Sequence, residues 1–565
     1  MERNAGRRAV LDYHLDSGIN WPIESETTMN SMQITSPLHQ AFGQYSDQCS
    51  VLVMGLGESG QAMAKWSLSQ GAKVVMHDTR EESNLSAQVI DRVQELLALG
   101  VSRITFGPQL LAIDCAEINL IAMSPGISPI DPIMAPFITT AQEQQIAIWG
   151  ELDFFSHALR SLEMHQQYTP KVIAITGTNG KTTTTALTGV ICAKSGKTVG
   201  VAGNISPSLL DKLMTCLLQN NLPDIWVLEL SSYQLYYSQD FNPHAATILN
   251  ISEDHLDWHG SMEHYVNAKA KIFGPNTIPV INRDDARVLA LIPEADWAKK
   301  RIISFGIQQP LEADSFGIKS DMGGAIDWLA WAPPVDEFNG NQTIKVRRTK
   351  KSQAAFDEEP LLIKHLIPAE ALLIKGRHNA SNALAALALA NAVGLGIAQL
   401  LHGLRDYTGE PHRVQTIAIV GDVEYIDDSK GTNVGAVIAA LQGLGMVDAK
   451  QGLRKILLIA GGDGKGQDFS PLREPILQYV KHLFLIGRDA SQIAQLFAGQ
   501  TLSITMAASL EDAVLQAAST AVAGDRVLLS PACASFDMFK NYQHRAEVFV
   551  NAVEELSINS FGAIE

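Results

Sequence analysis

The sequence is poor in cysteine. Its 565 residues include five cysteines, an odd number, scattered along the chain as Cys49, Cys115, Cys192, Cys216 and Cys533. They show neither the close spacing of a metal site nor the paired pattern of a disulfide framework. We therefore expect a protein of a reducing compartment, the cytoplasm.

The sequence also lacks long hydrophobic runs and an excess of positive charge. No apolar run reaches the roughly 18 residues that a membrane span needs. The first fifty residues are polar and have no hydrophobic signal core behind Arg7 and Arg8, so we expect residues 1–49 to form a poorly ordered extension. Acidic residues outnumber basic ones by 60 to 43, giving a net charge of −17. This balance argues against a nucleic-acid or membrane partner, because a polyanion would be repelled.

The core material, by contrast, is ample. Hydrophobic residues make up 46% of the chain and charged residues 18%, as in ordinary globular proteins. A chain of this length should form about three domains. Short apolar runs alternate with helical stretches and glycine turns, which predicts three α/β domains in series.

A strand, a glycine turn and a helix start follow one another around residue 180. Val172 to Ile175 is an apolar, β-branched run, and Lys181 opens a helix directly after the turn. Such a turn presents free backbone N–H groups and the positive end of a helix dipole, which suits polyphosphate. The sequence is a P-loop variant, since the standard motif has glycine where this chain has Ile175. We predict an ATP site with Mg²⁺, formed by Gly177, Thr178, Asn179, Gly180, Lys181, Thr182 and Thr183.

A second glycine turn lies near the start of the globular part. Residues 50–60 read as a strand followed by G-x-G-x-x-G, and Asp78 stands 18 positions after Gly60. This spacing matches the dinucleotide-binding fingerprint, so an NAD site is the leading interpretation of this segment alone. Any nucleoside diphosphate would satisfy the glycines equally well. Arg80 could then contact a base or sugar.

Three apolar strands of the central region each end in a polar residue. The strands expected at 199–202, 225–228 and 246–251 lead into Asn204, Glu229 and His255. With the P-loop strand beside them, they predict a parallel sheet that carries a metal-phosphate site along one edge. The lysines of the helical run 265–273 would by themselves be interpreted as a solvated face. Residues 308–370 are interpreted as a small strand-rich excursion whose basic cluster, 347–351, is solvated.

The third domain repeats the alternation. Strands are expected at 423–426, 455–460, 482–486 and 526–529, and the stretches D-D-S-K-G-T-N, G-G-D-G-K and S-P-A-C-A-S-F-D lie close behind three of them. Ligands of open α/β sheets gather at the carboxyl ends of strands. We therefore expect ligand-binding residues at strand ends in all three domains.

Six motifs in order resemble the Mur ligases of peptidoglycan synthesis: G-T-N-G-K-T, E-L-S-S-Y-Q-L, E-D-H-L-D, G-R-H-N-A-S-N-A-L-A-A, G-E-P-H-R and D-D-S-K-G-T-N. The D-T-R of residues 78–80 and the S-P-A-C-A-S-F-D stretch are most like the member that adds D-glutamate to UDP-N-acetylmuramoyl-L-alanine. The resemblance implies a Rossmann-like N-terminal domain (50–163), a central P-loop ATPase-type parallel sheet (164–411) and a C-terminal Rossmann-like domain (412–565). It implies that the first domain binds a UDP-sugar rather than NAD.

The resemblance also implies a mechanism. A substrate carboxylate attacks the γ-phosphate of ATP, and the amine of D-glutamate attacks the resulting acyl phosphate. Such chemistry needs cations where negative charge gathers. By carry-over, Lys181, His255, Lys269 and Asn204 are catalytic, with Lys269 carbamylated, and Thr182, Glu229, His255 and Lys269 hold two Mg²⁺ ions.

The remaining roles implied by the resemblance concern binding. Asn379 and Asn382 would face adenine, and Arg413 and Asp428 the phosphates and ribose. The UDP-sugar would contact Gly55, Gly57, Ser59, Gly60, Asp78, Thr79, Arg80, Ser124 and Gly126. The third-domain substrate residues would be Lys430, Thr432, Lys465, Ser535, Phe536 and Tyr542, with Lys465 pairing with the D-glutamate side chain. Phe536 and Tyr542 depart from the expected leucine and phenylalanine but preserve an apolar wall.

Other interpretations stay open at this point. The chain could be another Mur ligase or a folylpolyglutamate synthase-like ligase, an NAD(P)-dependent oxidoreductase, or a P-loop ATPase with a mechanical or regulatory role. We expect a cytoplasmic monomer with ATP, Mg²⁺, the UDP-sugar and D-glutamate as its ligands.

Overall fold

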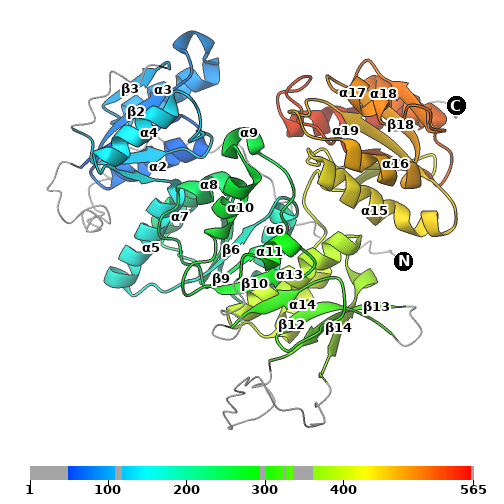
Figure 1. The fold of residues 1–565 in the computed structure, drawn as a ribbon, viewed down its shortest axis with the longest axis horizontal. Coiled ribbons are helices and arrows are strands. Elements are labelled where there is room, and N and C mark those ends of the chain that lie inside the picture. Colours follow the sequence, from blue (N-terminus) through cyan, green and yellow to red (C-terminus); the bar gives the residue numbers. More distant parts are fainter. Residues whose placement is uncertain (1–48, 109–116, 293–300, 322–325, 335–360, 562–565) are drawn as a thin grey trace, which may run out of the picture.

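The computed structural model describes residues 49–108, 117–292, 301–321, 326–334 and 361–561. The expected N-terminal extension, Cys115 and the basic cluster 347–351 lie outside these residues. Figure 1 shows an N-terminal domain (blue to cyan) and a C-terminal domain (yellow to red) that both lie against a central domain, with α9 (Leu256–His259) projecting between them in this view.

The N-terminal domain is built on a five-stranded parallel sheet in the order β3-β2-β1-β4-β5. Its central strands are buried throughout and are apolar except for Ser50, as expected for a parallel sheet covered by helices on both faces. The elements are β1 (Ser50–Met54), α2 (Glu58–Ser69), β2 (Lys73–Asp78), α3 (Ala87–Ala98), β3 (Arg103–Phe106), β4 (Leu120–Met123), α4 (Met134–Glu143), β5 (Ala147–Trp149) and α5 (Glu151–Gln166).

The central domain contains a nine-stranded sheet in the order β14-β13-β12-β11-β10-β9-β6-β8-β7. Its first half comprises β6 (Lys171–Thr176), α6 (Lys181–Lys194), β7 (Val199–Gly203), α7 (Leu209–Leu218), β8 (Ile225–Glu229), α8 (Ser232–Tyr237), β9 (Ala245–Ile248), α9 (Leu256–His259) and α10 (Met262–Ala270). Its second half comprises β10 (Ile278–Asn282), α11 (Ala286–Leu289), β11 (Ile303–Phe305), β12 (Ser315–Ser320), β13 (Asp327–Ala332), β14 (Lys364–Pro368), α13 (Arg377–Ala392) and α14 (Ile397–Asp406).

The C-terminal domain has a six-stranded sheet in the order β15-β16-β20-β17-β18-β19. It comprises β15 (Gln415–Val420), β16 (Val423–Asp427), α15 (Val434–Lys450), β17 (Ile456–Gly461), α16 (Arg473–Tyr479), β18 (Val480–Ile486), α17 (Ala490–Gln495), β19 (Ser503–Met506), α18 (Leu510–Thr520), β20 (Arg526–Leu529) and α19 (Tyr542–Phe561).

These elements confirm the α/β class and the three sheets, but they correct several expectations. The central sheet is parallel only from β7 to β12, because β13 and β14 add an antiparallel edge. The described part of the 308–370 excursion is therefore an extension of that sheet. The C-terminal sheet likewise has an antiparallel edge strand, β15. The strand expected at 246–251 ends at Ile248, and the helix expected to reach residue 273 ends at Ala270.

The hydrophobic cores show how the domains are joined. One cluster of buried residues runs from the first domain into the central one, because α2 and α5 pack against α7 and bring Trp66, Phe155 and Leu213 into the same core. The C-terminal domain has cores of its own on both faces of its sheet. Among the described residues, no core cluster joins it to the central domain. Its side-chain hydrogen bonds to the central domain include Arg413–Thr182 and Asn433–Asn179, and a polar interface is typical of domains that move relative to one another.

Candidate active site

The P-loop lies where the sequence predicted it, between β6 and α6. Gly177 and Gly180 both have positive φ, at 154° and 83°. A Cβ on Gly180 would lie 2.7 Å from Asn382 Oδ1, and one on Gly177 would lie 3.0 Å from Leu249 Cβ. Both positions therefore require glycine. Two hydrogen bonds from the side chain of Asn250 also fix the loop: Asn250 Oδ1 accepts from Asn179 N at 2.8 Å, and Asn250 Nδ2 donates to Asn179 O at 3.0 Å.

Two lysines donate hydrogen bonds to this loop. Lys181 Nζ lies 2.9 Å from both Gly177 O and Thr178 O. Lys269 Nζ, from α10, lies 3.0 Å from the same Gly177 O and 4.6 Å from the ring centroid of Tyr265. Lys269 is only 1% exposed, so the solvated-face interpretation of this lysine is wrong. Burial, reinforced by the neighbouring Lys181, lowers the pKa of Lys269 well below its ordinary value.

Acidic and amide groups face the start of α6. Glu229 ends β8 and is 1% exposed; its Oε1 accepts from Asn204 Nδ2 at 2.9 Å, whereas its buried Oε2 has no hydrogen-bond partner. Thr182 Oγ1 accepts from Arg413 Nη2 at 2.8 Å, so a C-terminal-domain cation reaches the P-loop helix. The structure thus brings together four predicted residues, Thr182, Asn204, Glu229 and Arg413, from four separate segments of the chain.

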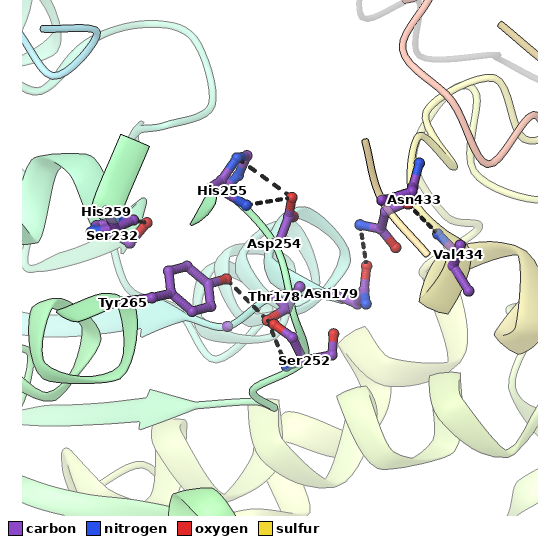
Figure 2. Close-up of polar contacts among 12 residues, drawn as sticks. Thr178, Asn179, Ser232, Ser252, Asp254, His255, His259, Tyr265, Asn433 and Val434 are labelled. Carbon is purple, nitrogen blue, oxygen red and sulfur yellow. Dashed lines mark hydrogen bonds and ion pairs between the residues drawn. The ribbon is translucent and has the colours of Figure 1, made fainter. Parts of the chain in front are cut away.

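His255 lies at the edge of this group, as the N-cap residue of α9 (Figure 2). Its φ of 56° places it in the left-handed region, and its ring lies 3.5 Å from Asp254 Oδ1. Tyr265 Oη and Thr178 Oγ1 are 3.0 Å apart, which ties α10 to the P-loop. Burial lowers the pKa of His255 despite the adjacent Asp254 carboxylate, so the neutral imidazole is favoured.

The expected adenine residues lie on α13. Asn382 Nδ2 donates to Asn379 Oδ1 at 3.2 Å, and Asn379 Nδ2 donates to Lys375 O at 2.9 Å. Asn382 also lies against Gly180. The two amides are therefore placed beside the P-loop, on the side of α6.

Strand ends of the C-terminal domain face the same region. Asp428 is buried and accepts from Ser530 Oγ at 2.6 Å, and burial raises its pKa to about 7. Burial and the nearby Arg413 lower the pKa of Lys430 to about 8, and its ammonium lies 5.3 Å from the ring centroid of Tyr542. Lys430 is near enough to Glu229 and Lys181 for their charges to act on it.

The loops expected to hold the amino acid are joined to one another. Asp463 and Ala534 form a two-way backbone bridge, at 3.0 and 2.9 Å, which brings Lys465 to 5.8 Å from the ring centroid of Phe536. The side chain of Phe536 is 68% exposed and therefore faces solvent on one side, whereas Ser535 is buried. Gln467 links this assembly to the loop of Thr432.

Sequence reasoning missed two supports of this assembly. Arg545 is buried in α19 and donates to Ser429 O at 2.7 Å and to Cys533 O at 3.1 Å, holding two of the loops together. Asn250 fixes the P-loop. Two sequence signals could have identified them: a basic residue in the mostly apolar face of α19, and an amide two residues after the buried strand β9.

The first-domain candidates surround the turn between β1 and α2. Gly55 has a φ of 91°, and a Cβ on Gly60 would lie 2.1 Å from Gly55 O. The buried Ser124 Oγ has no partner and points at both glycines. Gly57, Ser59, Thr79 and Gly126 lie on the same turn or at the adjoining strand ends.

Asp78 is occupied by contacts inside the protein. Its Oδ2 accepts from Leu56 N at 2.9 Å and from Arg80 Nη2 at 2.8 Å, while its Oδ1 accepts from Arg80 Nε at 2.7 Å. These Arg80 hydrogen bonds hold the pKa of Asp78 below its ordinary value, against the effect of burial. A dinucleotide site needs this carboxylate free for ribose hydroxyls. The geometry therefore disfavours NAD.

The first-domain turn also adjoins the central site. Ser206 Oγ, from the loop after Asn204, donates to Glu58 Oε1 at 3.1 Å, and Ser128 Oγ donates to Trp258 O at 2.8 Å. A ligand extending from the first-domain turn would therefore run toward Glu229 and His255.

Three family models match successive parts of the chain. Residues 49–150 match the family model "Mur ligase MurD-like, N-terminal domain", residues 175–390 "Mur ligase middle domain", and residues 412–533 "Mur ligase, glutamate ligase domain". The boundary that we expect between residues 163 and 164 falls within α5 and stays a prediction.

Two curated relatives are similar over nearly their whole length. The UDP-N-acetylmuramoylalanine–D-glutamate ligase of Ralstonia nicotianae is 50% identical over 510 residues, covering 90% of this chain and 97% of the relative. The enzyme of the same name from Paraburkholderia xenovorans is 49% identical over 508 residues, covering 90% and 96%. The crystal structure of MurF from Acinetobacter baumannii shares the fold, with a TM-score of 0.53 at 16% identity, over 89% of this chain and 93% of that one. None of the helices that the structure describes has the length and hydrophobicity to cross a membrane.

Proposed function

Because the chain belongs to the Mur ligase family, we propose that it joins D-glutamate to the terminal carboxylate of UDP-N-acetylmuramoyl-L-alanine at the expense of ATP. The reaction is a step of peptidoglycan precursor synthesis. The observation that carries the proposal is the Arg413–Thr182 hydrogen bond, which places a C-terminal-domain cation on the P-loop. A ligase needs such convergence, because the acceptor amine and ATP bind to different domains.

In this mechanism the carboxylate oxygen attacks the γ-phosphorus of ATP, and ADP leaves. The amine of D-glutamate then attacks the carbonyl carbon of the acyl phosphate; phosphate leaves, and the new amide gives up a proton. Lys181 and Arg413 neutralise the phosphoryl oxygens, since both lie at the start of α6. Lys430 faces the same region from the C-terminal domain.

The residues present fit Mg²⁺. The buried, unpartnered Glu229 Oε2 and the Thr182 hydroxyl are hard oxygen donors of the kind Mg²⁺ prefers. The described residues contain no group of three or more His, Cys, Asp or Glu that could hold a metal, which suits an ion that takes most of its ligands from phosphate and water. When bound, the ion supplies charge stabilisation at the phosphates. We propose two such ions, the second near His255 and a carbamylated Lys269.

The expected substrate contacts follow the same division among domains. We propose that the Gly55–Gly60 turn with Ser124 receives the diphosphate of the UDP-sugar, with Thr79 and Arg80 toward the uracil. Asn379 and Asn382 would hold adenine. Thr432, Lys465 and Ser535 would hold D-glutamate, where Lys465 offers a cation to its side-chain carboxylate. We further propose that the protein acts as a monomer in the cytoplasm.

The test is phosphate release with ATP, UDP-N-acetylmuramoyl-L-alanine and each of D-glutamate, L-glutamate, L-alanine and diaminopimelate. Of the four amino acids, we expect only D-glutamate to support phosphate release. Equal or greater turnover with diaminopimelate or L-alanine would assign the chain to another member of the family. Phosphate release without any amino acid, at the full rate, would favour an ATPase.

A further inference from the structure

Besides the Arg413–Thr182 hydrogen bond, the C-terminal domain contacts the P-loop through Asn433, to which the proposed mechanism gives no role. Asn433 Nδ2 donates to Asn179 Oδ1 at 3.0 Å (Figure 2). Both residues are otherwise fixed: Asn433 Oδ1 caps α15 by accepting from Ala436 N at 2.9 Å, and the backbone of Asn179 is clamped by Asn250. Each side chain therefore meets its partner in one defined orientation.

The helix that Asn433 caps approaches the P-loop very closely. A Cβ on Gly435 would lie 2.8 Å from Asn179 Nδ2, and one on Gly443, two turns further along, would lie 3.0 Å from the ring of His378 on α13. Glycine at these positions lets α15 sit directly on the nucleotide-binding elements. Contact through small residues and one amide pair is easily broken and remade, unlike a shared apolar core.

A chain of contacts continues from Asn433 into the amino-acid loops. The adjacent Val434 N donates to Gln467 Oε1 at 3.2 Å, and Gln467 Nε2 donates to Ala532 O at 2.6 Å. Gln467 lies two residues after Lys465, and Ala532 three before Ser535. The P-loop, the α15 cap and both amino-acid loops are thus joined by three successive hydrogen bonds.

We propose that Asn433 is a positioning residue that fixes the amino-acid loops relative to the P-loop, with Gly435 allowing the close approach. The effect on D-glutamate kinetics rests on the proposed function, whereas the Asn433–Asn179 contact does not. The acceptor amine must meet a carbonyl whose phosphate is held by the other domain. A small displacement of the amine from the carbonyl carbon lowers the reaction rate strongly. In this role Asn433 acts through Asn179 and the cap of α15, and not on the reacting atoms.

Three variants separate this role from folding. Asn433→Ser retains a good N-cap but is too short to reach Asn179. Gly435→Ala retains Asn433 and introduces the close contact, yet alanine is the better helix former, so thermal stability should be unchanged or higher. Gln442→Ala, exposed on the same helix, is the control.

The first measurement is hydrogen exchange in the full chain without ligands. Asn433→Ser and Gly435→Ala should accelerate exchange in peptides covering residues 176–182, and Gln442→Ala should not. The second is steady-state kinetics: Asn433→Ser should raise the KM for D-glutamate about fivefold, the effect of one hydrogen bond, and leave the KM for the UDP-sugar within about twofold.

A double-mutant cycle completes the test. If the two residues act through their contact, the double variant Asn179→Ala with Asn433→Ser should have a KM for D-glutamate no higher than that of the more impaired single variant. The proposal would be overturned if the KM changes of the two single variants multiplied in the double variant. It would also be overturned if hydrogen exchange in residues 176–182 were the same in all variants. Failure of the wild-type protein to ligate D-glutamate would instead refute the proposed function, while the exchange result would still decide the contact.

Discussion

Lys269 should be converted to a carbamate, and its replacement by alanine should abolish ligation. Its Nζ and that of Lys181 are each within 3.0 Å of Gly177 O, so the two nitrogens are at most about 6 Å apart. At that separation two ammonium groups repel by about 3 kcal/mol at an effective dielectric constant of about 20. Burial adds a further cost, and both effects favour the neutral amine.

A neutral amine can add CO₂, losing a proton and forming a carbamate. The modified side chain carries a negative charge, so the repulsion of about 3 kcal/mol from Lys181 becomes an attraction of similar size. The buried position should then hold the carbamate against hydrolysis. We expect Lys269→Ala to lower kcat by on the order of 10²-fold or more, the cost of losing an electrostatic group at the transferring phosphoryl.

The assay is rescue together with spectroscopy. Millimolar acetate should restore part of the activity of Lys269→Ala by supplying the missing carboxylate oxygens. In ¹³C-labelled bicarbonate the wild-type protein should give a carbamate carbon signal that is absent from Lys269→Ala. Lys271→Ala is the matched control, because Lys271 donates instead to Tyr236 O and Ser238 O on α8 and its loop. Rescue by methylamine and not by acetate, or no carbamate signal in the wild type, would refute the reasoning.

Three further outcomes are expected. Lys181→Ala should reduce ligation by about 10²-fold or more, because it removes a phosphate clamp, and near-normal turnover would contradict the ATP site. Asp78→Ala with Arg80→Ala should raise the KM for the UDP-sugar and leave that for ATP nearly unchanged; equal effects on both would indicate a purely structural pair. Burial raises the pKa of Glu151 from 4.5 to about 7, although Glu151 accepts from Leu210 N. Its folded-state pKa exceeds the unfolded one, so stability should fall as pH rises from about 4.5 to about 7, by up to about 3 kcal/mol. Glu151→Gln should flatten this dependence in thermal unfolding, and an unchanged slope would show that other groups cause it.

Much of the fold follows from local patterns. The buried strands β1, β6, β8 and β20 are apolar runs followed by glycine or polar turns, so they could be located to within a residue or two. Strands of three residues, such as β5 and β11, are too short to show a hydrophobic periodicity, and they were missed. The antiparallel edge formed by β13 and β14 could not be predicted, because the long stretch between these strands does not reveal that they pair.

The site was predictable where motif residues are adjacent in sequence, and less so where they meet in space. The P-loop lysine and Glu229 were identified from strand ends. Lys269, by contrast, was identified by resemblance, since α10 is short and mostly polar. The buried Tyr265, four residues earlier on the same face, is the physical signal that could have placed it. The Asn179–Asn433 pair joins residues 254 positions apart, and no local pattern could have indicated it.

The distribution of charge explains why catalysis should depend on the C-terminal domain. Lys181 belongs to the central domain, whereas Arg413 and Lys430 belong to the C-terminal domain. Glu229 lies near enough to Lys181 and Lys430 for its charge to act on both, and Arg413 donates to Thr182 Oγ1 beside Lys181. Three cations so close together repel one another, and after burial, which is the main cause, the charges of Arg413 and Lys181 lower the pKa of Lys430 further. A polyphosphate reverses the balance, because each cation then gains an anionic partner. ATP should therefore strengthen the contact between the two domains, and by linkage the contact should strengthen ATP binding by the same factor. The first domain is joined to the central one through a shared apolar core, so we expect its contact with the central domain to depend less on the nucleotide.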